Sequence, residues 1–82
     1  MPMTTHDYLG YVFTISERAG TPPYGVHFAD VPEIITNGAT LAEAFANACE
    51  ALELHLDSLQ RLGLPRPEPR HRLTVEPIGL VK

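Results

Sequence analysis

The fold is decided by residues 34–62, whose sequence is IITNGATLAEAFANACEALELHLDSLQRL. From residue 40 or 41 to about residue 62, the spacing of the apolar side chains predicts one long amphipathic helix. With about 100° of rotation per residue, the apolar side chains fall on one face. That face carries Leu41, Phe45, Ala48, Leu52, Leu56 and Leu59. The opposite side, facing solvent, carries the carboxylates of Glu43, Glu50 and Asp57.

Both ends of this helix are marked by recognisable capping residues. Thr40 is a good N-cap, and Glu43 three residues later completes a capping box. Gly63 ends the helix, and Pro65 prevents it from resuming. Just before the helix, we expect Gly38 to adopt a backbone conformation that other residues resist. We expect Asn47, on the flank of the helix, to bond the loop that precedes it.

Strands are predicted on both sides of the helix. Apolar and polar residues alternate over residues 8–16 and 24–29, and a third short strand covers 34–37. Short links between them predict an antiparallel meander. Residues 72–76 alternate again, and a right-handed helical crossover would place this fourth strand beside the first. The prediction is one α+β domain over residues 1–82, with its core in 8–76, the sheet order 3-2-1-4 and one sheet face uncovered.

The net charge and the composition of the chain limit its possible functions and partners. The 82 residues carry a net charge of −4, and an acidic surface repels the phosphates of nucleic acids. A basic protein is a more plausible partner. No apolar run approaches the roughly 20 residues that span a bilayer. The first residues also lack the basic, apolar and small-residue sections that make up a signal peptide. We therefore expect a cytoplasmic protein with no membrane contact.

Catalytic and metal-binding residues are not expected. The single cysteine, Cys49, excludes a disulfide or a thiolate metal cage within one chain. Cys49 and His55 are six residues apart, about 240° around the helix, so they cannot act as nucleophile and base. The four histidines lack metal-ligand spacing. The sequence predicts no enzyme, no cofactor and no metal.

Several short motifs, in order, resemble the N-terminal domain of HicB-like antitoxins. They are Phe28-Ala29-Asp30-Val31-Pro32, then Thr36-Asn37-Gly38-Ala39-Thr40, then Glu43-Ala44, Asn47-Ala48 and Glu50-Ala51-Leu52, and finally Gly63-Leu64-Pro65 with Pro67. The resemblance covers about residues 8–76. It implies a truncated ribonuclease-H-like fold, without the carboxylate cluster that ribonuclease H catalysis needs.

The resemblance also implies a function. HicB-like proteins neutralise HicA, a small basic ribonuclease that cuts mRNA. The chain departs from the family at Glu33, where the family has glycine. It also looks like the short, single-domain form, without the DNA-binding domain that many members carry after the fourth strand. We therefore expect no direct DNA binding by this chain. The motif residues to which we assign mainly structural roles are Phe28, Asp30, Pro32, Gly38, Thr40, Glu43, Ala44 and Asn47.

Candidate partner contacts are acidic or unusually placed residues: Asp30, Glu33, Glu50, Leu54 and Asp57. Three alternatives stay open here. Asp30 fits a turn-forming carboxylate, and the helix acids fit an outer face that is only solvated. Leu54 fits a self-association contact as well as a toxin contact. The alternative function is a homo-oligomeric module with no toxin, a dimer or tetramer, which the small core of an 82-residue chain favours.

Overall fold

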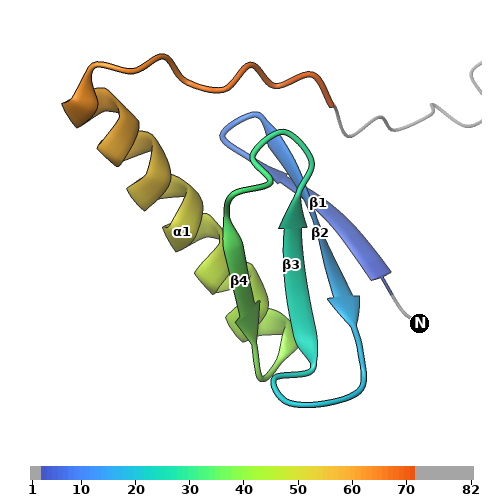
Figure 1. The fold of residues 1–82 in the computed structure, drawn as a ribbon. Coiled ribbons are helices and arrows are strands. Elements are labelled where there is room, and N and C mark those ends of the chain that lie inside the picture. Colours follow the sequence, from blue (N-terminus) through green and yellow to red (C-terminus); the bar gives the residue numbers. More distant parts are fainter. Residues whose placement is uncertain (1–2, 72–82) are drawn as a thin grey trace, which may run out of the picture.

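The computed structural model describes residues 3–71 and contains one sheet and one helix. The strands are β1 (Met3–Tyr8), β2 (Tyr11–Glu17), β3 (Tyr24–Phe28) and β4 (Ile35–Gly38), and the helix is α1 (Leu41–Leu62). All neighbouring strands are antiparallel, in the order β1-β2-β3-β4. The helix packs against one side of the sheet (Figure 1). The predicted α+β class and the predicted helix are confirmed.

The predicted first strand, 8–16, is wrong only at its beginning, because the chain turns back on itself at Leu9 and Gly10. These two residues have φ values of 54° and 89°, which is the conformation of a two-residue hairpin turn. Tyr8 pairs with Tyr11 across the turn. The alternating pattern continues through the turn and hides it in the sequence. Unbroken alternation would put Tyr8 on the sheet face opposite Tyr11, whereas the turn puts both residues on the helix-covered face.

The missed strand changes the predicted sheet order. The three strands of the expected meander correspond to β2, β3 and β4 and pair as predicted. However, β1 occupies the place beside β2 that the order 3-2-1-4 gave to residues 72–76. Those residues lie outside the described part of the chain. The relation to the ribonuclease H fold stays a prediction.

The core lies between α1 and the two central strands. Tyr11, Phe13 and Ile15 of β2, with Val26 and Phe28 of β3, face α1 at every second position and are buried. The side of the helix that packs against these strands is a buried stripe of Ala44, Ala48, Leu52 and Leu56. This stripe lies slightly to one side of the predicted one. Leu41 and Phe45 consequently lie at its margin and stay 44% and 39% exposed.

Gly38 is needed for a different reason than expected. Its φ is not in the left-handed region, so the prediction of an unusual backbone conformation is wrong. A Cβ at this position would lie 2.4 Å from the main-chain nitrogen of Ala44 and 2.7 Å from its Cα. Glycine therefore allows the first turn of α1 to rest directly on β4. Asn47 supports the same corner, because its Nδ2 donates to the carbonyl of Asn37 at 2.9 Å.

The predicted capping box is present. Thr40 has extended backbone angles, and its Oγ1 accepts a hydrogen bond from the Glu43 amide at 3.0 Å. Oε1 of Glu43 accepts in return from the amide of Ala39, one residue before the cap, at 2.5 Å. At the other end, Gly63 has a φ of 71° and its amide bonds the last turn. These contacts satisfy main-chain groups that a helix end leaves unpaired.

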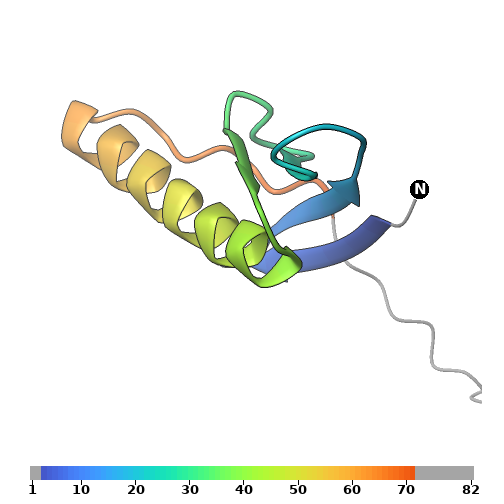
Figure 2. The same ribbon diagram turned by 90° about the horizontal axis from the view of Figure 1, so that it is seen from below.

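After α1 the chain returns toward the sheet through residues 63–71, which we call the exit segment. The last turns of α1 extend beyond the sheet, and the exit segment runs back from them (Figures 1 and 2). The hydroxyl of Tyr11 donates to the carbonyl of Pro67 at 2.7 Å. His71 is held in turn by Asp30. Tyr11 and Asp30 therefore hold the proline-rich exit segment in place.

Candidate partner-binding surface

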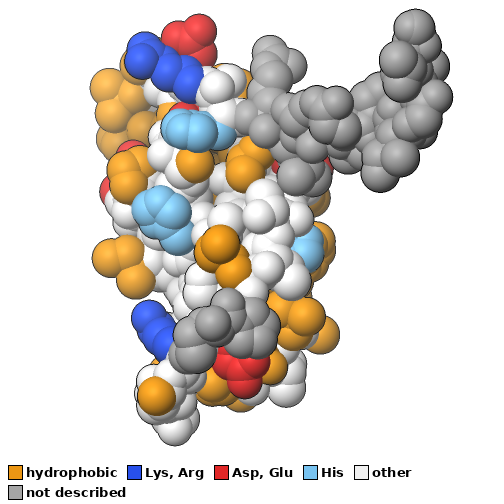
Figure 3. Space-filling view, turned by 90° about the vertical axis from the view of Figure 1, so that its right-hand side faces the viewer, with side chains coloured by type: hydrophobic (Ala, Val, Ile, Leu, Met, Phe, Trp, Pro, Cys, Tyr) orange, Lys and Arg blue, Asp and Glu red, His pale blue; other side chains and the backbone are white. Residues whose placement is uncertain are grey.

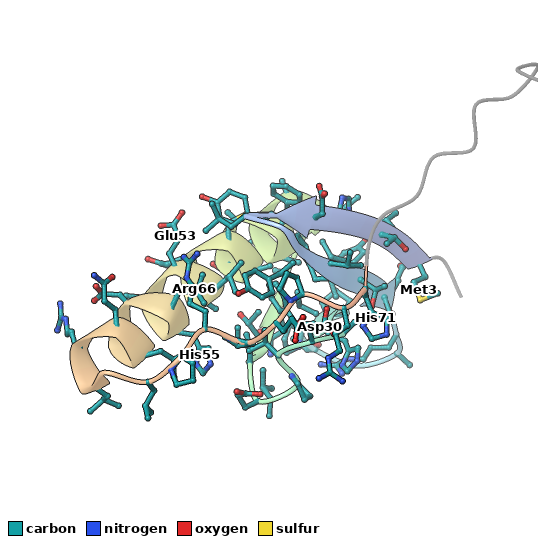
Figure 4. All side chains as sticks on the ribbon, turned by 90° about the horizontal axis from the view of Figure 1, so that it is seen from above. Met3, Asp30, Glu53, His55, Arg66 and His71 are labelled. Carbon is teal, nitrogen blue, oxygen red and sulfur yellow. The ribbon has the colours of Figure 1, made fainter. Side chains whose placement is uncertain are left out.

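Asp30 is engaged inside the chain and is not a free contact residue. Its side chain is 6% exposed. It accepts one hydrogen bond from the amide of His71 at 2.9 Å and lies 2.7 Å from Nδ1 of the same residue. Figure 4 shows the two residues side by side. The amide of His71, aided by its imidazole, holds the pKa of Asp30 below its ordinary value of 3.8. Asp30 thus fastens the exit segment to the loop after β3.

Glu33 lies beside the helix and faces His55. Oε2 of Glu33 is 3.3 Å from Nε2 of His55, and the carboxylate is 58% exposed. The imidazole nitrogen is enclosed and makes no aligned hydrogen bond. The pair becomes an ion pair only when His55 carries a proton. Glu33 therefore remains accessible to a partner, although one of its oxygens is directed at the helix.

Glu50, Leu54 and Asp57 share one exposed side of α1, and we call these three residues the outer helix face. Their spacing of four and three residues places them in one row. Leu54 is 63% exposed and lies between the two carboxylates along that row. Asp57 also forms an ion pair with Arg61 at 3.0 Å. The result is an accessible apolar side chain between acidic neighbours.

A second polar cluster, which the sequence did not reveal, joins α1 to β1. The hydroxyl of Tyr8 donates a hydrogen bond to Glu53, and this bond raises the pKa of Tyr8. Burial, together with the nearby Glu53 charge, raises the pKa of the Cys49 thiol. A thiol with a raised pKa holds its proton at neutral pH, which does not suit a nucleophile. Sequence alternation does not indicate this cluster, because without the turn it puts Tyr8 on the sheet face opposite Tyr11.

Two hollows on the described part of the chain are small and open. One, of about 220 Å³, lies where α1 overhangs the sheet and is lined by Leu9, Glu53, Leu56, Asp57, Gln60 and Arg66. The other, of about 190 Å³, lies on the sheet face away from α1 and includes Arg18, His27 and Ile35. Within residues 3–71, no three His, Cys, Asp or Glu side chains are grouped so that they could hold a metal ion. No helix in this part of the chain is long and apolar enough to cross a membrane.

Comparisons with known proteins identify no relative that would indicate what this surface binds. Family models, curated proteins and solved structures give no match. The resemblance to HicB-like antitoxins therefore depends on the motif residues quoted above. In the structure Phe28 and Ala44 are fully buried, and Gly38, Thr40, Glu43 and Asn47 shape the corner between β4 and α1. Pro32 is exposed. Most of the motif thus builds the fold, and the outer helix face lies beside it on α1.

Proposed function

We propose that this chain is an antitoxin-like binding module that neutralises a small, basic, mRNA-cleaving toxin of the HicA type by covering its active site. The observation that supports the proposal best is the outer helix face, where Leu54 is exposed between Glu50 and Asp57. A ribonuclease binds phosphates with basic residues. An acidic surface with an apolar centre can cover such a site, because charge speeds encounter and the apolar contact slows dissociation.

The proposal makes the chain a binding protein in the cytoplasm, with no catalytic residues, cofactor or metal of its own. Neutralisation needs only that the toxin's RNA-binding surface be blocked. Four of the five candidate contacts can take part: Glu33, Glu50, Leu54 and Asp57. Asp30 cannot, because His71 occupies it. We also propose that the chain does not bind DNA itself, and a gel-shift with its own upstream DNA tests this point.

The test starts from the genes adjacent to this one: any small basic protein encoded there is co-expressed with the chain, followed by copurification and a growth-rescue assay. The wild-type chain should copurify with the toxin and restore growth. Leu54→Asp and Glu50→Lys should each weaken both effects, since one removes the apolar contact and the other places a positive charge against a basic surface. Glu68→Lys is the matched control, because Glu68 has a 78% exposed side chain in the exit segment. If the wild-type pair neither copurifies nor restores growth, the antitoxin proposal is wrong.

A second candidate is a homo-oligomeric regulatory module without a toxin. It is favoured by the sheet face away from α1, where Figure 3 shows mainly hydrophobic, uncharged polar and histidine side chains, with charged groups toward the rim. Ile35 on this side is 86% exposed. If the chain self-associates and ignores the neighbouring basic protein, this candidate replaces the first.

A further inference from the structure

Within residues 3–71, no strand pairs with β1 on the side away from β2. Residues flanking a two-residue turn form a hydrogen-bonded pair, and such pairs alternate along an antiparallel ladder. Since Tyr8 and Tyr11 flank the turn, the even-numbered residues of β1 bond β2. Met3, Thr5 and Asp7 direct their main-chain N–H and C=O groups outward.

We propose that β1 pairs with β1 of a second copy of this chain, antiparallel and about a two-fold axis at Thr5, so that two sheets join into one. In this register Thr5 faces Thr5, and Met3 faces Asp7 of the other copy. Every outward main-chain group of β1 then finds a partner of the matching kind. The two helices lie on the same side of the joined sheet, because residues of equal parity share a face.

The side chains along this edge fit a second copy. Edge strands that avoid pairing usually carry lysine or proline, whereas β1 carries neither. Its only full charge, Asp7, falls opposite Met3 of the other copy, so the pairing brings no two carboxylates together. On the helix side, Phe45 packs edge-on against His6 at 5.1 Å between ring centres and is still 39% exposed. Leu41, one turn earlier, is 44% exposed. The two copies can bury these side chains against each other along the seam.

The opposite edge of the sheet is less suited to this role. β4 has four residues, against six in β1. The carbonyl of Asn37 in β4 already accepts a hydrogen bond from the side chain of Asn47. The chain enters α1 directly after β4, and the first turn of the helix presses on Gly38. Pairing through β1 also leaves the outer helix face free, so a dimer would offer two such faces to partners.

Cysteine cross-linking tests both the interface and its register. In a Cys49→Ala background, Thr5→Cys places two thiols opposite each other across the axis, where Cα atoms are about 5.5 Å apart. That separation allows a disulfide. Met3→Cys is the matched control on the same strand and face, but its symmetry mate lies about 14 Å away along the strand. With oxidised glutathione as oxidant, the Thr5→Cys chain should cross-link to a dimer at least about tenfold faster than the Met3→Cys chain.

Sedimentation of the full chain provides the second measurement. The wild type should sediment at twice its 9.0 kDa chain mass. Thr5→Pro should raise the dissociation constant by about tenfold or more, because proline removes an outward N–H and leaves the β1–β2 ladder intact. Thr5→Val, which keeps the N–H, should remain dimeric. A monomeric wild type, or equal cross-linking of the two cysteine variants, would overturn the proposal. Either result would mean that β1 does not pair with a second copy, and the edge would then be open to residues 72–76 or to another protein. The toxin test is independent of this outcome, since copurification does not require the dimer.

Discussion

Among the glycines of residues 3–71, replacing Gly38 with alanine should destabilise the protein most. The new Cβ would lie 2.4 Å and 2.7 Å from main-chain atoms of Ala44, and a main chain cannot rotate away as a side chain can. Ordinary contact begins at 3.4 Å, so β4 and the first turn of α1 must separate by about 1 Å. This movement loosens Ala48 and Leu52 against the sheet. Overpacking of this kind costs about 3 kcal/mol, a large share of the stability of a small domain.

Urea unfolding followed by circular dichroism measures this cost. With a slope of about 1 kcal/mol per molar urea for a small domain, the midpoint of Gly38→Ala should fall by about 3 M. Gly63→Ala is the control: its Cβ meets no atom within 4 Å, and only the φ of 71° is unfavourable, at about 1 kcal/mol. Adding Ala44→Gly should not rescue Gly38→Ala, because the main chain remains in place. A midpoint for Gly38→Ala above that of Gly63→Ala, or a full rescue, would refute the reasoning.

Three further predictions follow from the contacts of the described residues. Thr40→Ala should lower the free energy of unfolding by about 1 kcal/mol through loss of the N-cap, whereas Thr40→Ser should retain most of it, as urea midpoints can show. Asp30 has a lowered pKa in the folded state, so the stability that it contributes is present above the ordinary carboxyl pKa and is lost as the pH falls through the lowered value. Asp30→Asn should therefore reduce the loss of unfolding free energy at acid pH. An unchanged loss would contradict the role of the His71 contact. The Cys49 thiol, whose pKa is raised, should react with an aromatic disulfide reagent more slowly in the folded chain than in urea, and equal rates would argue against its burial.

The helix and its corner with β4 could be predicted because local chemistry determines them. Thr40 and Glu43 form a cap that depends on residues within one turn, and Gly63 ends the helix in the left-handed conformation. The alternation of residues in β2 and β3 likewise agrees with the structure, in which Phe13, Ile15 and Phe28 lie on one face and in the core. In each case the signal and the structure lie in the same short stretch.

The hairpin between β1 and β2 could not be predicted from alternation alone. A two-residue turn normally contains asparagine, aspartate or glycine at its first position, and here that position is Leu9, which rarely adopts a positive φ. Gly10 was the only local signal. The role of Asp30 was equally hidden, because its partner His71 lies 41 positions later. No periodicity links residues that meet only through the return of the chain after α1.

The exit segment has a consequence for how the chain assembles. Tyr11 and Pro67 are 56 positions apart in sequence, and Asp30 and His71 are 41 apart. The strands, in contrast, each pair with the next one along the chain. Closing a long loop costs more chain entropy than closing a short one, so the sheet and helix can form before the exit segment docks. We expect the segment to be the last part to close and the first to open, so the amide hydrogen of His71 should exchange with solvent well before those of β2 and β3.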